Sequence, residues 1–243
     1  MLVAIHQPHY IPWLGYLDRM VRSDLFIVLD HVQFERRNYQ NRTMIRLEGE
    51  ERWLTVPVVQ LSQKETIVDK RIDNSEAGTR AWGPTHFKTL KYAYRKAPHF
   101  AHYEKRLEDI LTAHWDKLVD LDLAMLGFLR ESFGITTPIK RSSEMRAEGA
   151  KSDLLLNLCV EIGPGTTFLG GIGGSRRYLD ADAFRQAGIG VQWQEFTHPT
   201  YPQCGDAPFT PGLMSLDFLF NCGPAAAETL WERAPRDNEL LAA

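Results

Sequence analysis

The densest group of chemically capable side chains lies at residues 6–16, in the sequence HQPHYIPWLGY. A neutral imidazole can take a proton from a hydroxyl or an amine, and amides and phenols can orient a polar substrate. We therefore take His6 and His9 as candidate general bases. The candidate substrate ligands of this stretch are Gln7, Tyr10, Trp13 and Tyr16. The alternative is a proline-stiffened loop whose histidines only hydrogen-bond to their neighbours.

A second polar group, Asp30-His31-Val32-Gln33, follows an apolar run at residues 25–29. Asp30 could accept the ring proton of His31 and leave the other ring nitrogen free as a general base. The alternative is an aspartate that caps the next turn beside a solvated histidine. His31 is thus a third candidate base, and Asp30 and Gln33 are candidate substrate ligands.

Two further stretches have residues suited to binding anions. Residues 36–42 read RRNYQNR, and guanidinium groups suit the two-point recognition of phosphates and carboxylates. We select Asn41 and Arg42 from this stretch, with a solvated charged loop as the alternative.

A glycine-rich segment, GGIGGSRR, covers residues 170–177 after a short apolar run. Glycines allow positive φ angles, and successive backbone N–H groups can then form a concave anion site. The spacing matches neither a Walker loop nor a dinucleotide fingerprint. The candidate ligands here are Gly173, Gly174, Ser175 and Arg176, and a flexible loop is the alternative.

The segment HPTYPQ at residues 198–203 follows the last predicted strand and contributes His198, Tyr201 and Gln203 as candidate ligands. A proline-rich turn before the terminal helices is the alternative. Asp217, in an apolar helical pattern, requires a buried partner such as an arginine or a backbone N–H, and structural locking is favoured over catalysis there.

The elements expected to position these residues alternate between strands and helices. A strand at 2–5, a helix from about 13 to 21 and a strand at 25–29 form a βαβ unit. A hairpin is predicted at 43–60, a short strand near 67–68, helices at 84–97, 103–115 and 118–132, and alternating elements from 135 to 196. Helices at 215–221 and 225–233 complete the chain.

This pattern predicts an α/β fold with a mainly parallel sheet. We expect one domain over residues 1–243, with residues 84–134 as a helical subdomain or insertion. The carboxyl ends of parallel strands share one edge of a sheet, and ligands of open α/β sheets bind there. The stretches 6–16, 30–42, 170–177 and 198–203 are therefore expected to meet in one hollow, with Gly15 opening a helix start to an anion.

The composition of the chain excludes several classes of binding partner. The 243 residues have a net charge of −3, which argues against a generic nucleic-acid binder and hence against genomic DNA as a partner. No apolar run reaches the ~18 residues of a membrane span, and no signal peptide is evident. Three cysteines, an odd number, suit reduced thiols. We expect a cytoplasmic protein with a small-molecule or nucleotide-linked substrate and no membrane insertion.

Several motifs together resemble the WbqC-like family over residues 2–224: IHQPHYIPWLGYLDRM, SDLFIVLDHVQF, NYQNRTMIR, WLTVPV, GGIGGSRRYLD and HPTYPQCGDAPFTPGLMSLDFLFNCG. Members of that family look like products of bacterial surface-polysaccharide gene clusters and are described as glycine or aminoacyl transferases. The resemblance implies transfer of an aminoacyl or acyl group, glycyl included, to an amino sugar or related acceptor, in O-antigen or specialised-metabolite biosynthesis. Residues 173–177 depart from relatives that often have a lysine or a Ser-Ala pair there, which weakens a phosphate-holding role.

Two other functions remain open. The layout around residues 13–17 is similar to the HxGH segment of nucleotidylyltransferases, with Trp13 and Tyr16 at the histidine positions, so an ATP-dependent adenylylating enzyme is one alternative. A metal-dependent hydrolase that uses His6, His9, His31 and His198 is the other, although no HExxH motif supports it.

The cofactor is unknown from the sequence, and no metal or redox cofactor is expected. A nucleotide-linked or phosphopantetheine-linked substrate would suit the anion-binding features. An acyl carrier protein or an aminoacyl-tRNA would then be the donor.

Overall fold

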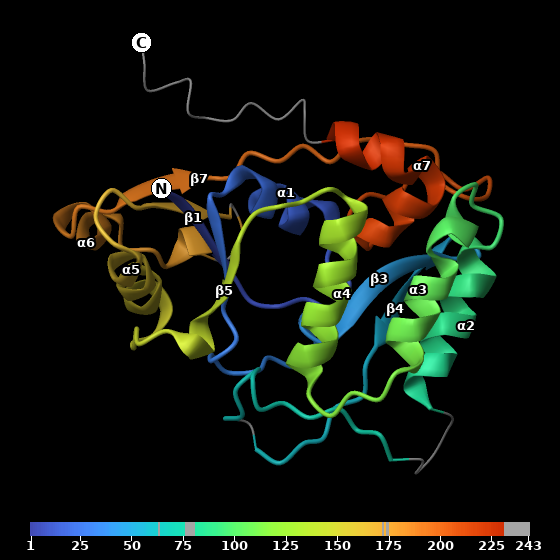
Figure 1. Cartoon of the computed structure of the whole chain (residues 1–243), viewed down its shortest axis with the longest axis horizontal. Helices are drawn as coiled ribbons and strands as arrows, with labels where there is room; N and C mark the ends of the chain where they lie inside the picture. Colours follow the sequence, from blue (N-terminus) through green and yellow to red (C-terminus); the bar gives the residue numbers. More distant parts are fainter. Residues whose placement is uncertain (63, 76–80, 172, 174, 231–243) are drawn as a thin grey trace.

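The centre of the fold is a sheet of five parallel strands in the order β5-β2-β1-β6-β7 (Figure 1). The computed structural model describes residues 1–62, 64–75, 81–171, 173 and 175–230. The strands are β1 (Leu2–His6), β2 (Leu25–Val28), β5 (Ile139–Arg141), β6 (Thr167–Gly170) and β7 (Gly190–Trp193). The predicted α/β class with a mainly parallel sheet is confirmed, and so is the N-terminal βαβ unit, which closes through α1 (Leu14–Arg22).

Alternate residues of the strands face two different layers, because successive side chains of a strand point to opposite faces. Val3 and Ile5 pack with α5 (Lys151–Ile162) and α6 (Ala181–Gln186). Ala4, between them, faces the larger core on the side of α1. His6 has the same parity as Ala4, and its ring contacts Tyr16 of α1. The alternation therefore directs His6 to the α1 side of the sheet.

The strand order reverses beside β1. The chain proceeds from β1 through β2 to β5 on one side, then crosses by way of α5 to β6 on the other side of β1. In open α/β sheets, the crevice at such a reversal, outside the carboxyl ends of the strands, is where ligands bind. In this sheet that position lies beyond His6 of β1 and Gly170 of β6, and we refer to it as the crevice.

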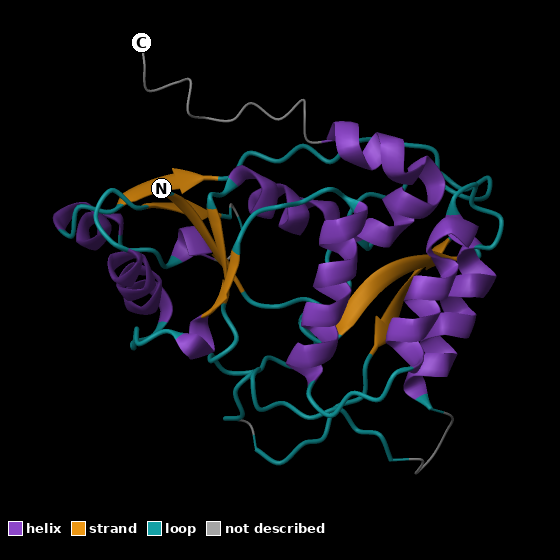
Figure 2. Cartoon of the chain, in the orientation of Figure 1, coloured by secondary structure: helices purple, strands orange, loops and turns teal. Residues whose placement is uncertain are grey.

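A helical layer and a second sheet lie beside the parallel sheet (Figure 2). The layer consists of α2 (Trp82–Tyr94), α3 (Phe100–Thr112), α4 (Leu118–Ser132) and α7 (Ser215–Leu230). The sheet is the antiparallel pair β3 (Arg42–Leu47) and β4 (Glu50–Thr55). One hydrophobic core includes Ala4 of β1, Leu107 of α3, Leu129 of α4 and Leu219 of α7. The assignment of residues 84–134 as an insertion in a single domain stays a prediction.

Three local predictions were wrong. The predicted strand at 135–141 is shortened to 139–141, because Pro138 has no N–H group for the ladder and only its carbonyl pairs, with the N–H of Phe26. Trp115 lies beyond α3, where its indole N–H donates to the carbonyl of Ile110 (2.8 Å). Residues 67–68 form a turn rather than a strand.

The C-terminal element α7 consists of two helices that meet at a kink at Gly223, whose φ of 79° is not helical, so the two helices predicted there are confirmed. Residues 231–233 of the second predicted helix lie outside the described residues. None of the helices in the described part of the chain has the length and apolar character needed to cross a bilayer.

Candidate functional site

Arg19 of α1 places a cation in the crevice beyond β1 and β6. Its Nε donates to Oε1 of Gln194 (2.9 Å), and Gln194 Nε2 donates to the carbonyl of Gly15 (2.8 Å) and to Oδ2 of Asp18 (2.6 Å). A Cβ atom on Gly171 would lie 2.1 Å from Nη2 of Arg19, so the guanidinium packs against the backbone just after β6. Burial lowers the pKa of Arg19 to about 10, and the side chain is therefore still protonated at neutral pH.

His6 stands at the end of β1 as a neutral imidazole with one free ring nitrogen. Its Nδ1 lies 2.9 Å from the carbonyl oxygen of Gln7. A carbonyl only accepts, so Nδ1 holds the proton and Nε2 keeps its lone pair. Burial, followed by the positive charge of Arg19, lowers the pKa of His6 to about 3. His6 is therefore neutral, with a lone pair at Nε2, throughout the neutral range.

His9 lies deeper, within a group of aromatic rings. Its ring centroid is 4.7 Å from that of His6, 5.1 Å from Tyr16 and 5.2 Å from Tyr39, on which it stacks. Burial, followed by the charges of His6 and Arg19, holds the pKa of His9 well below its usual value. His9 is only 7% exposed, and its Nδ1 has no partner among the described residues.

Behind this ring group lies Asp122 of α4, which the sequence analysis did not select. It is 1% exposed, and neither carboxyl oxygen has a hydrogen-bond partner in the described part of the chain. Burial raises the pKa of Asp122 well above its usual value. Burial, followed by the charge of Asp122, raises the pKa of Tyr10 and of Tyr16. The available sequence signal was an aspartate between two leucines in an apolar helix.

Replacing Asp122 with leucine is expected to stabilise the protein by about 1–3 kcal/mol at pH 7, the usual cost of a buried polar group without a partner. The unfolded carboxyl ionises near pH 3.9, whereas the folded one stays protonated to higher pH. The contribution of Asp122 to the wild-type free energy of unfolding therefore falls as pH rises above about 4, and the gain from Asp122→Leu should shrink at pH 4.

Urea unfolding at pH 4 and pH 7 measures both effects. Asp120→Leu is the matched control, because Asp120 is an exposed residue in the first turn of the same helix and its loss should not stabilise the protein. An unchanged free energy of unfolding for Asp122→Leu would mean that this carboxyl has a partner in solution.

Asp30 and His31 are linked through a serine, not directly as predicted. Asp30 is fully buried and accepts from Nε of Arg141 (2.7 Å), from the N–H of Ser143 (2.8 Å) and from the hydroxyls of Ser143 and Ser142 (2.9 and 3.2 Å). Nδ1 of His31 lies 2.6 Å from Oγ of Ser142. Because the single hydroxyl proton of Ser142 goes to the carboxylate, Nδ1 of His31 is the donor and the Nε2 of the neutral ring keeps its lone pair.

The other predicted residues of the first loop have mixed environments. Gln7 Oε1 accepts from Nε2 of Gln40 (2.9 Å), and the hydroxyl of Tyr10 lies 2.9 Å from Nδ1 of His86. A Cβ atom on Gly15 would lie 2.2 Å from the indole of Trp13. Gly15 therefore does not open the start of α1 to a ligand, because the ring of Trp13 already fills that space.

The predicted anion-binding stretches separate into structural and exposed residues. Asn41 donates to the carbonyl of Val56 (2.8 Å), and the guanidinium of Arg42 lies 4.0 Å from the ring of Trp53, so both support the second sheet. Gln33 is exposed and bridges to Thr66.

In the glycine-rich segment, Gly173 is exposed and Ser175 begins a 3₁₀ turn. Gly174 lies outside the described residues. Arg176 is exposed, and its guanidinium stands 5.6 Å from the centroid of Trp193. The glycine that approaches the crevice most directly is Gly171, which was not selected from the sequence.

Residues 198–203 pack with aromatic rings and with α7. His198 packs with the rings of Phe196, Tyr201 and Phe209. Tyr201 packs on Phe218 of α7, and Gln203 bonds to Asp217 and Arg46. Phe196 connects this segment to the first loop, because its ring centroid lies 5.5 Å from that of Trp13. The meeting of the four stretches in one hollow stays a prediction.

No three His, Cys, Asp or Glu side chains of the described residues lie together as a metal-binding group. The pair His6 and His9 therefore has no third ligand of these types in the part of the chain that the structure describes. This finding does not favour the hydrolase alternative, which requires three protein ligands and an open position.

The strand order of the parallel sheet reverses beside β1, and neutral imidazoles and a half-buried arginine lie at the carboxyl edge there. These features define an α/β protein with a polar candidate site at the reversal point. A family model described as the WbqC-like protein family matches residues 7–229, and the chain belongs to that family. The uncharacterized protein Rv1507c of Mycobacterium tuberculosis is 32% identical over 231 residues, which cover 94% of this chain and 96% of that protein. No solved structure matches the chain.

Proposed function

We propose that this protein is a transferase that moves an aminoacyl or acyl group, such as glycyl, to the amine of an amino sugar or a related acceptor. The single observation that carries the proposal is the pairing of Arg19 with a neutral His6 in the crevice. Membership of the WbqC-like family and the transferase activity that the sequence resemblance implies supply the reaction class.

Arg19 has the role of holding an anionic part of the substrate, such as the phosphates of a nucleotide-linked sugar. A half-buried guanidinium binds oxyanions well because water competes less for it than on an open surface. Gly171 permits this arrangement, since any side chain there would meet the guanidinium. A bound oxyanion beside His6 also favours the protonated imidazole, which moves the pKa of His6 from about 3 toward the neutral range where a base is most effective.

His6 is the proposed general base, with His9 as the ring that packs against it. The acceptor nitrogen attacks the carbonyl carbon of the donor, and a C–N bond forms. Nε2 of His6 takes the proton that this nitrogen loses. The bond from the carbonyl carbon to the leaving oxygen or sulfur then breaks, and the leaving group receives the proton from His6. His31, with its Nε2 free, is the second candidate base along the same edge.

The alternative of an adenylylating enzyme keeps one supporting observation, which is the βαβ unit that ends in this crevice. In that reaction, the carboxylate of a substrate attacks the α-phosphate of ATP and pyrophosphate leaves. The two proposals differ in their products, so that one set of incubations can separate them.

The test uses the purified full-length protein with activated glycyl esters and thioesters and a panel of dTDP-amino sugars, with the products analysed by mass spectrometry. We expect an N-glycyl sugar nucleotide and no pyrophosphate. Pyrophosphate release from ATP that depends on an added carboxylate would instead support adenylylation. If neither product forms across the panel, while the sugar nucleotides bind without change, the protein is a binding module and the proposal fails.

A further inference from the structure

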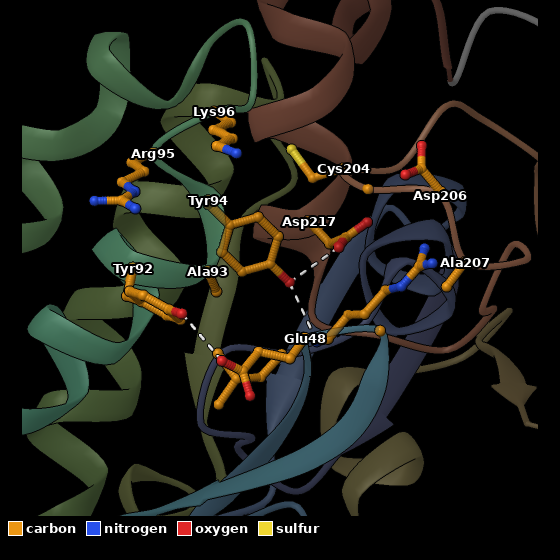
Figure 3. Close-up of a pocket in the computed structure, with 14 residues that line it drawn as sticks. Glu48, Tyr92, Ala93, Tyr94, Arg95, Lys96, Cys204, Asp206, Ala207 and Asp217 are labelled. Carbon is orange, nitrogen blue, oxygen red and sulfur yellow. Dashed lines mark hydrogen bonds between the residues drawn. The ribbon is translucent and has the colours of Figure 1, made fainter.

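A cavity apart from the crevice lies between the β3–β4 turn, the end of α2 and the start of α7. Its volume is about 370 Å³. The walls come from the β3–β4 turn, the end of α2, residues 204–207 and the start of α7. Figure 3 shows Tyr94 and Asp217 pointing toward one another across this space, with Arg95 and Lys96 on one side and Asp206 on the other. None of its lining residues takes part in the site proposed above.

Arg46 of β3 is the unusual member of this lining. It is a cation with only 6% of its surface exposed. Its Nη1 donates to Oε1 of Gln203 (3.0 Å), while Nε and Nη2 have no partner among the described residues. Nε and Nη2 form one edge of the planar guanidinium, the edge that binds a carboxylate or phosphate through two parallel hydrogen bonds.

The neighbouring acidic side chains, Asp217 and Glu48, accept no hydrogen bond from Nε or Nη2 of Arg46 in the described part of the chain. Asp217 Oδ2 accepts from the hydroxyl of Tyr94 (2.9 Å), and its Oδ1 accepts from Nε2 of Gln203 (3.0 Å). Glu48 accepts from the hydroxyl of Tyr92 (3.0 Å). Gln203 is itself held by Thr210, which donates its N–H (2.9 Å) and accepts at its carbonyl (2.9 Å). The network therefore fixes the guanidinium while leaving one bidentate edge unsatisfied.

A buried cation with unused donors is costly unless an acceptor comes to it. We propose that this cavity is a binding site for a small oxyanion group, a carboxylate or a phosphate, which Arg46 holds through Nε and Nη2. The exposed Arg95 and Lys96 balance the negative charges of Glu48 and Asp206 in the same lining. The site is independent of the transferase proposal, because it uses none of the same residues.

The test measures the thermal unfolding midpoint of the full-length protein in sodium phosphate and in sodium acetate, against sodium chloride at equal ionic strength. We expect a concentration-dependent rise of the midpoint in at least one of the two oxyanions. The arm that gives the rise tells phosphate from carboxylate. Calorimetric titration with the same salts should then give an affinity that Arg46→Gln weakens at least 10-fold.

Two further variants keep the result interpretable. Ala207→Glu places a carboxylate in the lining and should abolish binding even if Arg46→Gln folds poorly. Arg52→Gln is the matched control, because Arg52 is an exposed arginine of β4 whose partner is Glu50, and it should bind the anion normally.

Alkylation of Cys204, which also lines the cavity, localises the ligand, because bound anion should slow the labelling of this thiol in peptide maps. A midpoint equal to that in chloride, or binding that survives both Arg46→Gln and Ala207→Glu, would overturn the proposal. Binding lost in Arg19→Gln but retained in Arg46→Gln would place the anion in the crevice, which supports the transferase site and refutes this one.

Discussion

Replacement of His6 by glutamine is expected to lower the rate of group transfer about 10²–10⁴-fold, the usual contribution of a positioned general base. Glutamine keeps an amide N–H that can reach the carbonyl of Gln7 but has no basic nitrogen. The effect should fall on kcat, because substrate binding by Arg19 is left in place. His102→Gln is the matched control, since His102 is an exposed histidine on α3, and its rate should equal that of the wild type.

The dependence on pH tests the same role without a mutation. In the free protein the pKa of His6 is about 3, so the neutral base persists and kcat/KM should show no acid limb from His6 between pH 7 and about pH 4. A bound anion raises the pKa of His6, so the acid limb of kcat should lie at higher pH than that of kcat/KM. Identical limbs for the two parameters, or a wild-type rate for His6→Gln, would remove His6 from the reaction and leave His31 as the base to test.

The second large effect is expected from Arg19→Gln, which should weaken the binding of the anionic substrate roughly 10–150-fold, as for the loss of a hydrogen bond to a charged group worth about 1.5–3 kcal/mol. The change should appear in KM or in the dissociation constant of a nucleotide-linked sugar. Calorimetric titration with the same sugar nucleotides measures it directly. Arg185→Gln is the control, because Arg185 is an exposed arginine on α6.

A second variant separates the position of the guanidinium from its charge. Gly171→Ala keeps Arg19 but places a methyl group 2.1 Å from the present position of Nη2, so the guanidinium must move. We expect weaker binding than in the wild type with little change in overall charge. Normal affinity in both Arg19→Gln and Gly171→Ala would show that the substrate anion lies elsewhere, and the transferase site would then need a different position.

The fold class could be predicted from the sequence because it depends on local patterns of apolar residues. Two short apolar runs, at 2–5 and 25–29, flank a segment whose apolar residues recur at helical spacing. This local pattern predicts a βαβ unit without information from the rest of the chain. The first loop was identifiable for a similar reason, since its polar and aromatic side chains are concentrated within eleven residues. The strand predicted at 135–141 is longer than the observed strand at 139–141, because the apolar pattern does not reflect that Pro138 lacks an N–H group for the ladder.

The sequence by itself determined the α/β class, the family and the polar loop around His6, because each depends on the types and spacing of neighbouring residues. Only the tertiary structure decided which distant groups lie beside the candidate site. Arg19 is fixed by Gln194, 175 residues away, and Asp30 is held by Arg141, 111 residues away. The order of the strands in the sheet determines which of these distant residues come into contact. The reversal of that order beside β1, which no local pattern encodes, brings Gly171 against Arg19 near His6.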